Sequence, residues 1–228
     1  MTSYVVAGAG TDIGKTYVSC ALLRRWRAEG RTCAPLKPVL SGYDEANLFD
    51  SDAAHLLAAN GETPSREAIA AISPWRFAAP LAPPQAAKLE GRELDFAAIV
   101  EFCRSRIRAA PSHTTHLVET AGGVMSPLTH DHTMLDLIVE LGAPVILVTG
   151  DYLGAVSHTL TALEALRARN QSVALLIINE STNGVGLAQT GQMIAPYHPT
   201  LGVACLARGG EWFLSTPTSG DARLLLHP

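Results

Sequence analysis

The chain has 228 residues, of which 47% are hydrophobic and 17% are charged, and its formal net charge is −4. This composition excludes intrinsic disorder, because disordered chains combine few apolar residues with a high net charge. The mild negative charge, with a pI near 6.0, gives no electrostatic reason to expect nucleic acid as a partner.

Several features predict a cytoplasmic protein with no membrane partner. The first residues lack the basic start and long apolar run of a signal peptide, and no apolar run approaches the roughly 18 residues needed to span a bilayer. The cysteines form no C-x-x-C pair and lie in apolar runs, as reduced core thiols do; they are Cys20, Cys33, Cys103 and Cys205. We expect one domain over residues 1–228.

The predicted elements begin with a strand at residues 4–7, which runs into a glycine-rich turn. Behind this turn Val18, Leu22 and Trp26 recur at i, i+4 and i+8, which predicts a helix with one apolar face. A second strand is predicted at residues 33–36. The stretch 41–84 contains five prolines and one predicted helix near residues 52–59, so we interpret it as an irregular insertion over the strand ends.

Apolar helical and strand patterns alternate through the rest of the chain. Strands are predicted at residues 117–118, 145–148, 173–178 and 201–206, because these runs are short and rich in β-branched residues. Helices are predicted around residues 96–107, 160–166 and 184–197. This alternation favours an α/β, P-loop NTPase-like three-layer fold, with a mostly parallel sheet covered by helices on both faces.

The turn after the first strand has the composition of a phosphate-binding loop. Residues 8–16, G-A-G-T-D-I-G-K-T, lead directly into the first helix. Glycines let backbone N–H groups converge on an anion, and the helix N-terminus adds its dipole. Lys15 would reach the β- and γ-phosphates, and Thr16 would bind Mg²⁺. Ala9 breaks the strict pattern, but the flanking strand and helix favour nucleotide binding over an ordinary glycine-rich turn.

Three acids could serve this loop, and each has a structural alternative. Glu119 ends an apolar strand, where an acid can hold Mg²⁺ but can also stabilise a turn. Asp52 stands at the start of a predicted helix, where N-capping competes with metal binding. Asp12 lies inside the loop, either solvated or beside a cation that offsets its charge against the phosphates.

Two further polar residues end predicted strands. Lys37 precedes Pro38 and is therefore held extended near the same rim as Lys15. A second lysine there could stabilise negative charge in a transition state, although an isolated lysine is usually solvated. Asn179 could read an adenine edge through its amide, or it could be a turn residue.

Four histidines resemble metal ligands by composition alone. His113 and His116 form one group, and His130 and His132 flank Asp131 in another. Neither group has the spacing of a zinc site. We predict that both lie in polar loops, exposed or bonded locally.

Together these segments resemble the dethiobiotin synthetase family, whose phosphate loop has the pattern G-T-D-T-x-V-G-K-T. The resemblance extends in order along most of the chain. The family motifs K-P-V-x-S-G, S-D-A and V-E-G-A-G-G-x-x-x-P-L correspond to residues 37–42, 51–53 and 118–128. The run P-V-I-L-V…L-G…H-T-L corresponds to residues 144–160.

The resemblance implies a C–N-forming ligase of biotin biosynthesis, acting on small molecules with Mg²⁺ and ATP. 7,8-Diaminopelargonic acid takes up CO₂ as a carbamate, ATP phosphorylates the carbamate, and the second amine closes the ureido ring. ADP and phosphate are released. The family is homodimeric with the substrate across the interface, so residues 122–123 and 153–158 would serve the neighbouring subunit.

The resemblance also implies residue roles. The catalytic residues are Thr11, Lys15 and Lys37. The nucleotide-binding residues are Asp12, Ile13, Gly14, Lys15, Thr16, Tyr17, Asp52, Glu119, Gly122, Asn179 and Cys205. The substrate-binding residues are Thr11, Lys37, Ser41, Gly122 and Gly123, and the magnesium ligands are Thr16, Asp52 and Glu119. The diamine would supply the cation that Asp12 needs.

The chain departs from the family pattern at several positions. Thr120 replaces a usual glycine, Ser157 a common asparagine, and Cys205 a proline of the adenine pocket. The stretch from Ala79 to residue 84 loses an acid and a histidine.

Three alternatives compete with synthesis of dethiobiotin. The first is a related P-loop ligase, and the second is a duplicate that binds ATP without synthesis. The third is a P-loop nucleotide switch, which typically carries an extra lysine early in its loop. That lysine is absent between Gly8 and Gly14, and residues 223–228 are too short for an amphipathic membrane helix.

Overall fold

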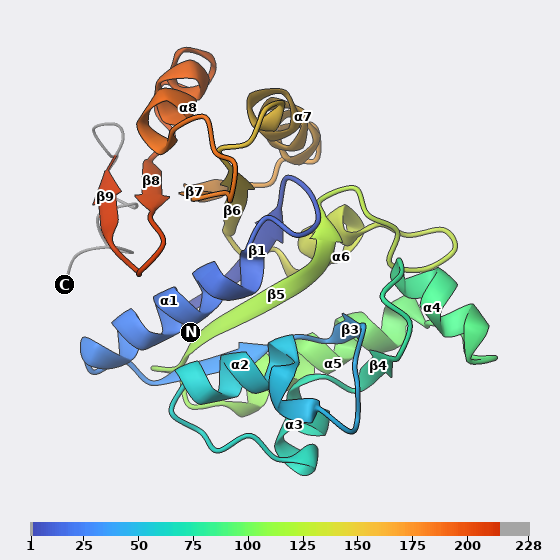
Figure 1. Ribbon diagram of the computed structural model, residues 1–228. Coiled ribbons are helices and arrows are strands. Elements are labelled where there is room, and N and C mark those ends of the chain that lie inside the picture. The colour runs from blue at the N-terminus through green and yellow to red at the C-terminus, as the bar shows by residue number, and fades with distance from the viewer. Residues whose placement is uncertain (1, 215–228) are drawn as a thin grey trace.

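Seven strands form one sheet in the order β2-β5-β1-β6-β7-β8-β9 in this computed structural model, which describes residues 2–214 (Figure 1). They are β1 (Thr2–Gly8), β2 (Cys33–Leu36), β5 (Thr115–Gly123), β6 (Val145–Gly150), β7 (Val173–Asn179), β8 (Val203–Leu206) and β9 (Trp212–Leu214). All neighbours pair in parallel except β8 and β9, which are antiparallel. The six predicted strands and the mostly parallel sheet are confirmed.

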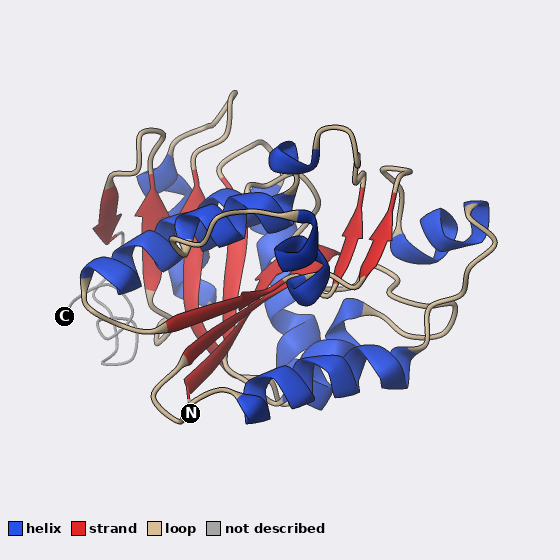
Figure 2. Cartoon of the chain, turned by 90° about the horizontal axis from the view of Figure 1, so that it is seen from below, coloured by secondary structure: helices blue, strands red, loops and turns tan. Residues whose placement is uncertain are grey.

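Helices cover both faces of this sheet (Figure 2). The larger ones are α1 (Lys15–Ala28), α5 (Phe96–Ala109), α6 (Met134–Leu141), α7 (Ala155–Ala168) and α8 (Leu187–Ile194). Val18, Leu22 and Trp26 of α1 are fully buried, as their spacing predicts. The strands between the helix layers are largely buried, because parallel strands are covered on both sides; the whole of β6 is buried.

The stretch 41–84 is more regular than predicted. The predicted helix is confirmed as α2 (Asp52–Ala59), but α3 (Arg66–Ile72), α4 (Pro83–Leu89) and the 3₁₀ turn η1 (Leu48–Asp50) were missed. β3 (Val39–Ser41) and β4 (Trp75–Phe77) form a separate two-stranded parallel sheet. Strands of three residues are too short to show a period. Pro83 and Pro84 occupy the first turn of α4, where proline is tolerated.

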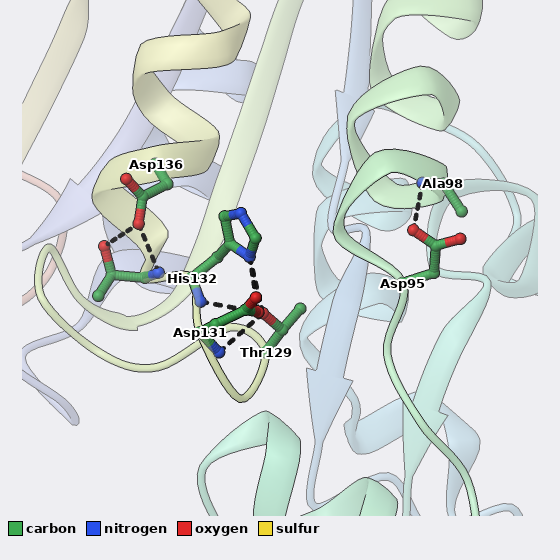
Figure 3. Close-up of polar contacts among 7 residues, drawn as sticks. Asp95, Ala98, Thr129, Asp131, His132 and Asp136 are labelled. Carbon is green, nitrogen blue, oxygen red and sulfur yellow. Dashed lines mark hydrogen bonds and ion pairs between the residues drawn. The ribbon is translucent and has the colours of Figure 1, made fainter.

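The start of α6 is fixed by a reciprocal cap between Thr133 and Asp136. The Thr133 N–H and hydroxyl donate to Asp136 Oδ2 at 2.8 and 2.9 Å (Figure 3). Such a capping box satisfies donors that a helix end leaves free. At the other end of the sheet, η2 (Ala195–Tyr197) continues α8 toward β8.

None of the helices within residues 2–214 is both long and apolar enough to cross a membrane. The prediction made for residues 223–228 concerns a segment outside the described residues.

Candidate active site

The phosphate loop connects the carboxyl end of β1 to the amino end of α1. Gly14 caps α1 in a left-handed conformation with φ of 83°, which glycine adopts without the strain of a side chain. A Cβ atom at Gly14 would also lie 2.2 Å from the Asn179 Nδ2 atom. Asn179 Nδ2 donates to the Ile13 carbonyl at 3.1 Å and thus ties the loop to β7.

Lys15 opens α1 with its side chain almost buried, at 7% exposure. Burial, together with the nearby Lys37 ammonium, lowers the pKa of Lys15 to about 8. Thr16, the next residue, donates its hydroxyl to Glu119 Oε1 at 2.8 Å. The Lys15 ammonium is thus destabilised by its surroundings and lies at a helix N-terminus. A polyanion such as phosphate binds strongly at such a position, because its negative charge stabilises the ammonium.

Lys37 lies 2.6 Å from Glu119 Oε1 and 3.0 Å from Asp52 Oδ2. Burial disfavours its charge, but the two carboxylates outweigh burial and raise the pKa of Lys37. Burial likewise opposes the charge on Asp52, and the Lys37 ammonium nevertheless lowers the pKa of that carboxyl. The site therefore holds two lysines and two carboxylates in close electrostatic contact.

The donor set beside the loop fits a magnesium ion. Glu119 Oε2 is buried and has no hydrogen-bond partner among the described residues, so one carboxylate oxygen remains for a cation. Thr16 and Asp52 supply further oxygen atoms next to it. Mg²⁺ is usually held by one or two carboxylates and completes its shell with water and substrate phosphates. Within residues 2–214 no three His, Cys, Asp or Glu residues gather into a metal-binding group.

Two adjoining cavities meet at the phosphate loop. The first, of about 430 Å³, extends over the carboxyl ends of β6, β7 and β8. The second, of about 690 Å³, contains the ionic cluster and reaches the segment before α4. Thr11, Asp12 and Gly14 line both cavities, so one extended ligand could lie across the loop with a part in each.

Most of the predicted site residues line one of these cavities. Ile13 and Asn179 line the first. Lys15, Thr16, Lys37, Ser41, Asp52 and Gly122 line the second. Glu119 is buried beneath the second cavity and bonds to Lys37 and Thr16. Gly123 is buried behind Gly122, and its N–H donates to Ser126 Oγ at 2.7 Å.

Two predicted nucleotide contacts lie elsewhere. Cys205 is fully buried inside β8 and is not among the residues that line the first cavity, so its contact with the nucleotide stays a prediction. Its sulfur lies in the core because strand residues at the interior of a covered sheet are enclosed on both faces. The Tyr17 side chain is 40% exposed on α1 and lines neither cavity.

The alternatives for the acids can now be separated. Ser51, not Asp52, caps α2, since Ser51 Oγ accepts the Ala54 N–H at 3.2 Å. Asp52 is thus free to face Lys37. Glu119 does not end its strand, because β5 continues to Gly123.

The histidines follow the prediction in one group only. His132 Nδ1 lies 2.8 Å from Asp131 Oδ1 and 3.2 Å from the Thr129 hydroxyl, a local network (Figure 3), while His130 and His113 are exposed. His116 contradicts the prediction, because it is buried in β5 and neither ring nitrogen has a partner among the described residues. The Thr115–Gly123 strand starts earlier than its apolar run indicated.

Several residues that line the first cavity were not predicted from the sequence. These are Tyr152, Glu180, Ser181, Thr182 and Arg208. All follow the carboxyl ends of β6, β7 or β8, where ligands of parallel sheets bind. That rule, applied to every strand, would have identified them.

Comparison with protein families gives one consistent match. A family model described as an AAA domain matches residues 2–208. The chain is 49% identical over 183 residues to the ATP-dependent dethiobiotin synthetase BioD of Phenylobacterium zucineum. The aligned region covers 80% of this chain and 78% of that protein. It is 45% identical over 213 residues to the protein of the same name from Methylobacterium nodulans, covering 92% and 95%. The match to the Caulobacter vibrioides protein of that name is also 45%, over 212 residues.

Solved structures of distant proteins share the fold. The MinC:MinD cell division complex of Aquifex aeolicus matches with a TM-score of 0.53 at 8% identity, covering 91% of this chain and 81% of that one. The signal recognition particle receptor FtsY of Elizabethkingia anophelis, in complex with GDP, matches with a TM-score of 0.51 at 13% identity. This chain is covered to 98% and spans 62% of the receptor chain. These likenesses concern the fold alone and confirm the P-loop NTPase-like class.

Proposed function

Because the chain belongs to the dethiobiotin synthetase family, we propose that its two adjoining cavities hold ATP and the diamine on either side of the phosphate loop. Its activity is the ATP-dependent synthesis of dethiobiotin, a ligase reaction that forms C–N bonds. The nucleotide-switch alternative is not favoured. The observation that carries the proposal is the cluster of Lys15 and Lys37 in the second cavity, beside the loop that both cavities share.

The nucleotide base occupies the first cavity and the triphosphate crosses the loop into the second. Backbone N–H groups at residues 12–17 face the phosphates, with Lys15 as their cation. The Tyr17 side chain is exposed and lines neither cavity, so only the Tyr17 backbone N–H would contact the phosphates. Asn179 contributes by holding the loop at Ile13, and its remaining amide atoms face the base.

The diamine occupies the second cavity, where one amine and CO₂ give a carbamate with loss of a proton. Lys37 stabilises the carbamate oxygens, while Lys15 and Thr11 contact the phosphoryl group as it passes from ATP to the carbamate. The second amine then attacks the carbonyl carbon and expels phosphate, which closes the ring. Fixed cations lower such barriers because negative charge develops where they already lie.

Other residues of the second cavity bind the rest of the substrate. Ser41 and the Gly122–Gly123 backbone contact its amines, and Asp12 offsets their positive charge. Leu40, Pro80, Leu81, Ala82 and Pro83 form an apolar wall suited to a hydrocarbon chain. Between Ala79 and residue 84 the chain lacks the family's acid and histidine, so the substrate would meet apolar side chains there.

Thr16, Asp52 and Glu119 hold Mg²⁺ in this proposal. The unpartnered oxygen of Glu119 supports that role. When bound, the ion neutralises charge on the β- and γ-phosphates. Lys37 pairs with Asp52 and Glu119, and a bound ion would share these carboxylates, which would leave the Lys37 ammonium available to the carbamate.

We also propose that the chain acts in the cytoplasm as a single domain and forms a homodimer. An exposed apolar face between α7 and α8 supports the dimer. It surrounds a hollow of about 610 Å³ lined by Leu153, Val156, Leu160, Val185 and Met193. Apolar patches of this kind commonly mark protein interfaces.

The test is phosphate release from MgATP and bicarbonate, with and without 7,8-diaminopelargonic acid. Lys37→Gln keeps a donor for Glu119 but removes the charge, and we expect at least a hundredfold loss of turnover, on the order seen for an electrostatic donor. Lys88→Gln makes the same change at an exposed lysine and should be neutral. Equal activity in Lys37→Gln and wild type would refute the proposed site, and phosphate release without the diamine would refute coupled synthesis.

A further inference from the structure

A buried carboxylate outside the proposed site fixes one wall of the first cavity. Asp151 follows β6 directly and is only 2% exposed. Opposite it lies the segment 180–186, which connects β7 to α8. Glu180, Ser181 and Thr182 of this segment line the first cavity.

Four hydrogen bonds tie this segment to Asp151. Its Oδ1 atom accepts the Ser181 N–H at 2.7 Å, and Oδ2 accepts the Gly186 N–H at 3.2 Å. Its backbone carbonyl accepts the Val185 N–H at 2.7 Å, and its own N–H donates to Ser181 Oγ at 3.2 Å. Both ends of the segment are therefore held by one residue.

The middle of the segment passes directly over the carboxylate. A Cβ atom at Gly184 would lie 2.1 Å from Asp151 Oδ2, a distance that no real side chain could accept. A Cβ atom at Gly150 would lie 2.5 Å from Ser181 Oγ. The segment and the end of β6 thus fit together only because both positions are glycine.

We propose that Asp151 is a positioning residue that fixes segment 180–186 and so sets the selection of the nucleotide base. This inference rests on the proposed placement of the base in the first cavity. N–H bonds to a carboxylate are stronger than neutral ones, so two of them hold the wall firmly without a side chain entering the cavity. A wall already ordered before binding spares the nucleotide the cost of ordering it.

Base selection should depend on this order. A fixed wall of Glu180, Ser181 and Thr182 presents its polar groups at defined positions, and a base that cannot match them leaves them unpaired. A loose wall adapts to several bases. Loss of the Asp151 carboxylate should therefore weaken ATP binding and reduce discrimination against other bases, while leaving the chemistry beyond the loop unchanged.

Two variants reach the segment by different routes. Asp151→Asn replaces one accepting oxygen with an NH₂ group that faces a backbone donor, and Gly184→Ala forces the segment away from an intact carboxylate. In the full-length protein we expect both to raise the KM and Kd for ATP about tenfold. The kcat at saturating ATP should stay within about twofold, with the KM for the diamine unchanged. The preference for ATP over CTP and GTP should fall.

A matched control separates positioning from simple loss of stability. Asp136→Asn makes the same change at a carboxylate that also accepts from a backbone N–H, in the cap of α6 (Figure 3). It should lower the Tm without changing the KM for ATP or the base preference. A purely structural role for Asp151 would make the two Asp→Asn variants alike.

The outcomes also separate this inference from the proposed function. Asn179→Ala tests whether the first cavity binds the nucleotide at all. One outcome would overturn the role of Asp151 alone. In that outcome Asn179→Ala raises the KM for ATP, while Asp151→Asn and Gly184→Ala keep the wild-type KM for ATP and the wild-type base preference. Unchanged ATP affinity in all three variants would overturn the base-site assignment itself, and this inference with it.

Discussion

Lysine is rare in this chain, and its placement is selective. Only three of the 17 basic residues are lysines, Lys15, Lys37 and Lys88. The first two are buried in the candidate site. A lysine carries a compact charge whose pKa responds to its surroundings, whereas arginine stays charged. Burial disfavours the charge on Lys15, and a bound phosphate would compensate that cost, whereas the neighbouring carboxylates already stabilise the charge on Lys37.

Lys15→Met should stabilise the unliganded protein while abolishing turnover. The lowered pKa of about 8, against an ordinary value of 10.5, means that charge on Lys15 opposes folding by on the order of 3 kcal/mol below pH 8. We expect urea unfolding at pH 7 to show a gain of about 1–3 kcal/mol. The unfolded state binds the Lys15 proton more tightly than the folded state does. The unfolding free energy of the wild type should therefore rise toward that of Lys15→Met as the pH rises from about 8 to 10.5. A less stable Lys15→Met would contradict this account.

The affinity for ATP should weaken above pH 8. There the free enzyme loses the Lys15 proton, which ATP binding must restore, so Kd should rise by up to about tenfold per pH unit. Lys37 does not titrate in this window, because its pKa is raised. Calorimetric titration from pH 7 to 9.5 measures the slope, and Lys15→Arg, which stays charged, should flatten it. A wild-type slope as flat as that of the arginine variant would exclude Lys15 as the group responsible.

At the scale of elements, the cap of α2 connects helix stability to the proposed metal site. Ser51 Oγ accepts the Ala54 N–H and donates to the Leu48 carbonyl at 2.6 Å. Asp52 follows directly and pairs with Lys37. The first turn of this helix thus carries a proposed magnesium ligand.

Ser51→Ala should cost about 1 kcal/mol, the usual value of a serine cap, and should raise the Mg²⁺ concentration needed for half-maximal activity. Ser65→Ala is the control, because Ser65 caps α3 with an equivalent bond to the Ala68 N–H at 3.1 Å. Both variants should lose similar stability in denaturant titrations. Only Ser51→Ala should shift the Mg²⁺ requirement; equal shifts would show that Asp52 does not depend on its helix.

The elements differ in how far the sequence could predict them. The β1–loop–α1 unit was predictable because an apolar strand, a glycine-rich turn and an i, i+4, i+8 face occur in succession. Lys37 and Glu119 were identified by motif, but their 2.6 Å contact joins the residue after β2 to a residue within β5, which no local pattern contains. The prediction that His116 lies in a polar loop failed because burial depends on the packed sheet. The short β3, β4 and α3 have too few residues to show a period.

At the scale of the whole molecule, the apolar face between α7 and α8 predicts the state of assembly. Leu153 is 90% exposed, and Val185 and Met193 beside it are more than half exposed. Leu153 follows Tyr152, which lines the first cavity. Dimer contact at this face would therefore lie next to the nucleotide.

Leu153→Asp should convert a dimer to a monomer, because a charge buried at an apolar interface cannot be compensated. Light scattering with size-exclusion chromatography measures the mass. Leu89→Asp is the control, since Leu89 is 69% exposed on α4 and lies outside this face. Turnover should fall with the dimer in Leu153→Asp. A dimer that survives this change would place the interface elsewhere.

The strand order delays the pairing of β1 while the protein is being synthesised on the ribosome. Thr2 pairs with Thr115, and Val5 of the same strand pairs with Val145. At translation speeds of about 5–20 residues per second, β1 waits roughly 6–23 s for β5 to be synthesised. During that time Val5, Val6 and Ala7, which the finished protein encloses completely, remain an apolar strand with two open edges. Until β5 and β6 have been made, this segment is therefore the part of the nascent chain most exposed to misassembly through its unpaired edges.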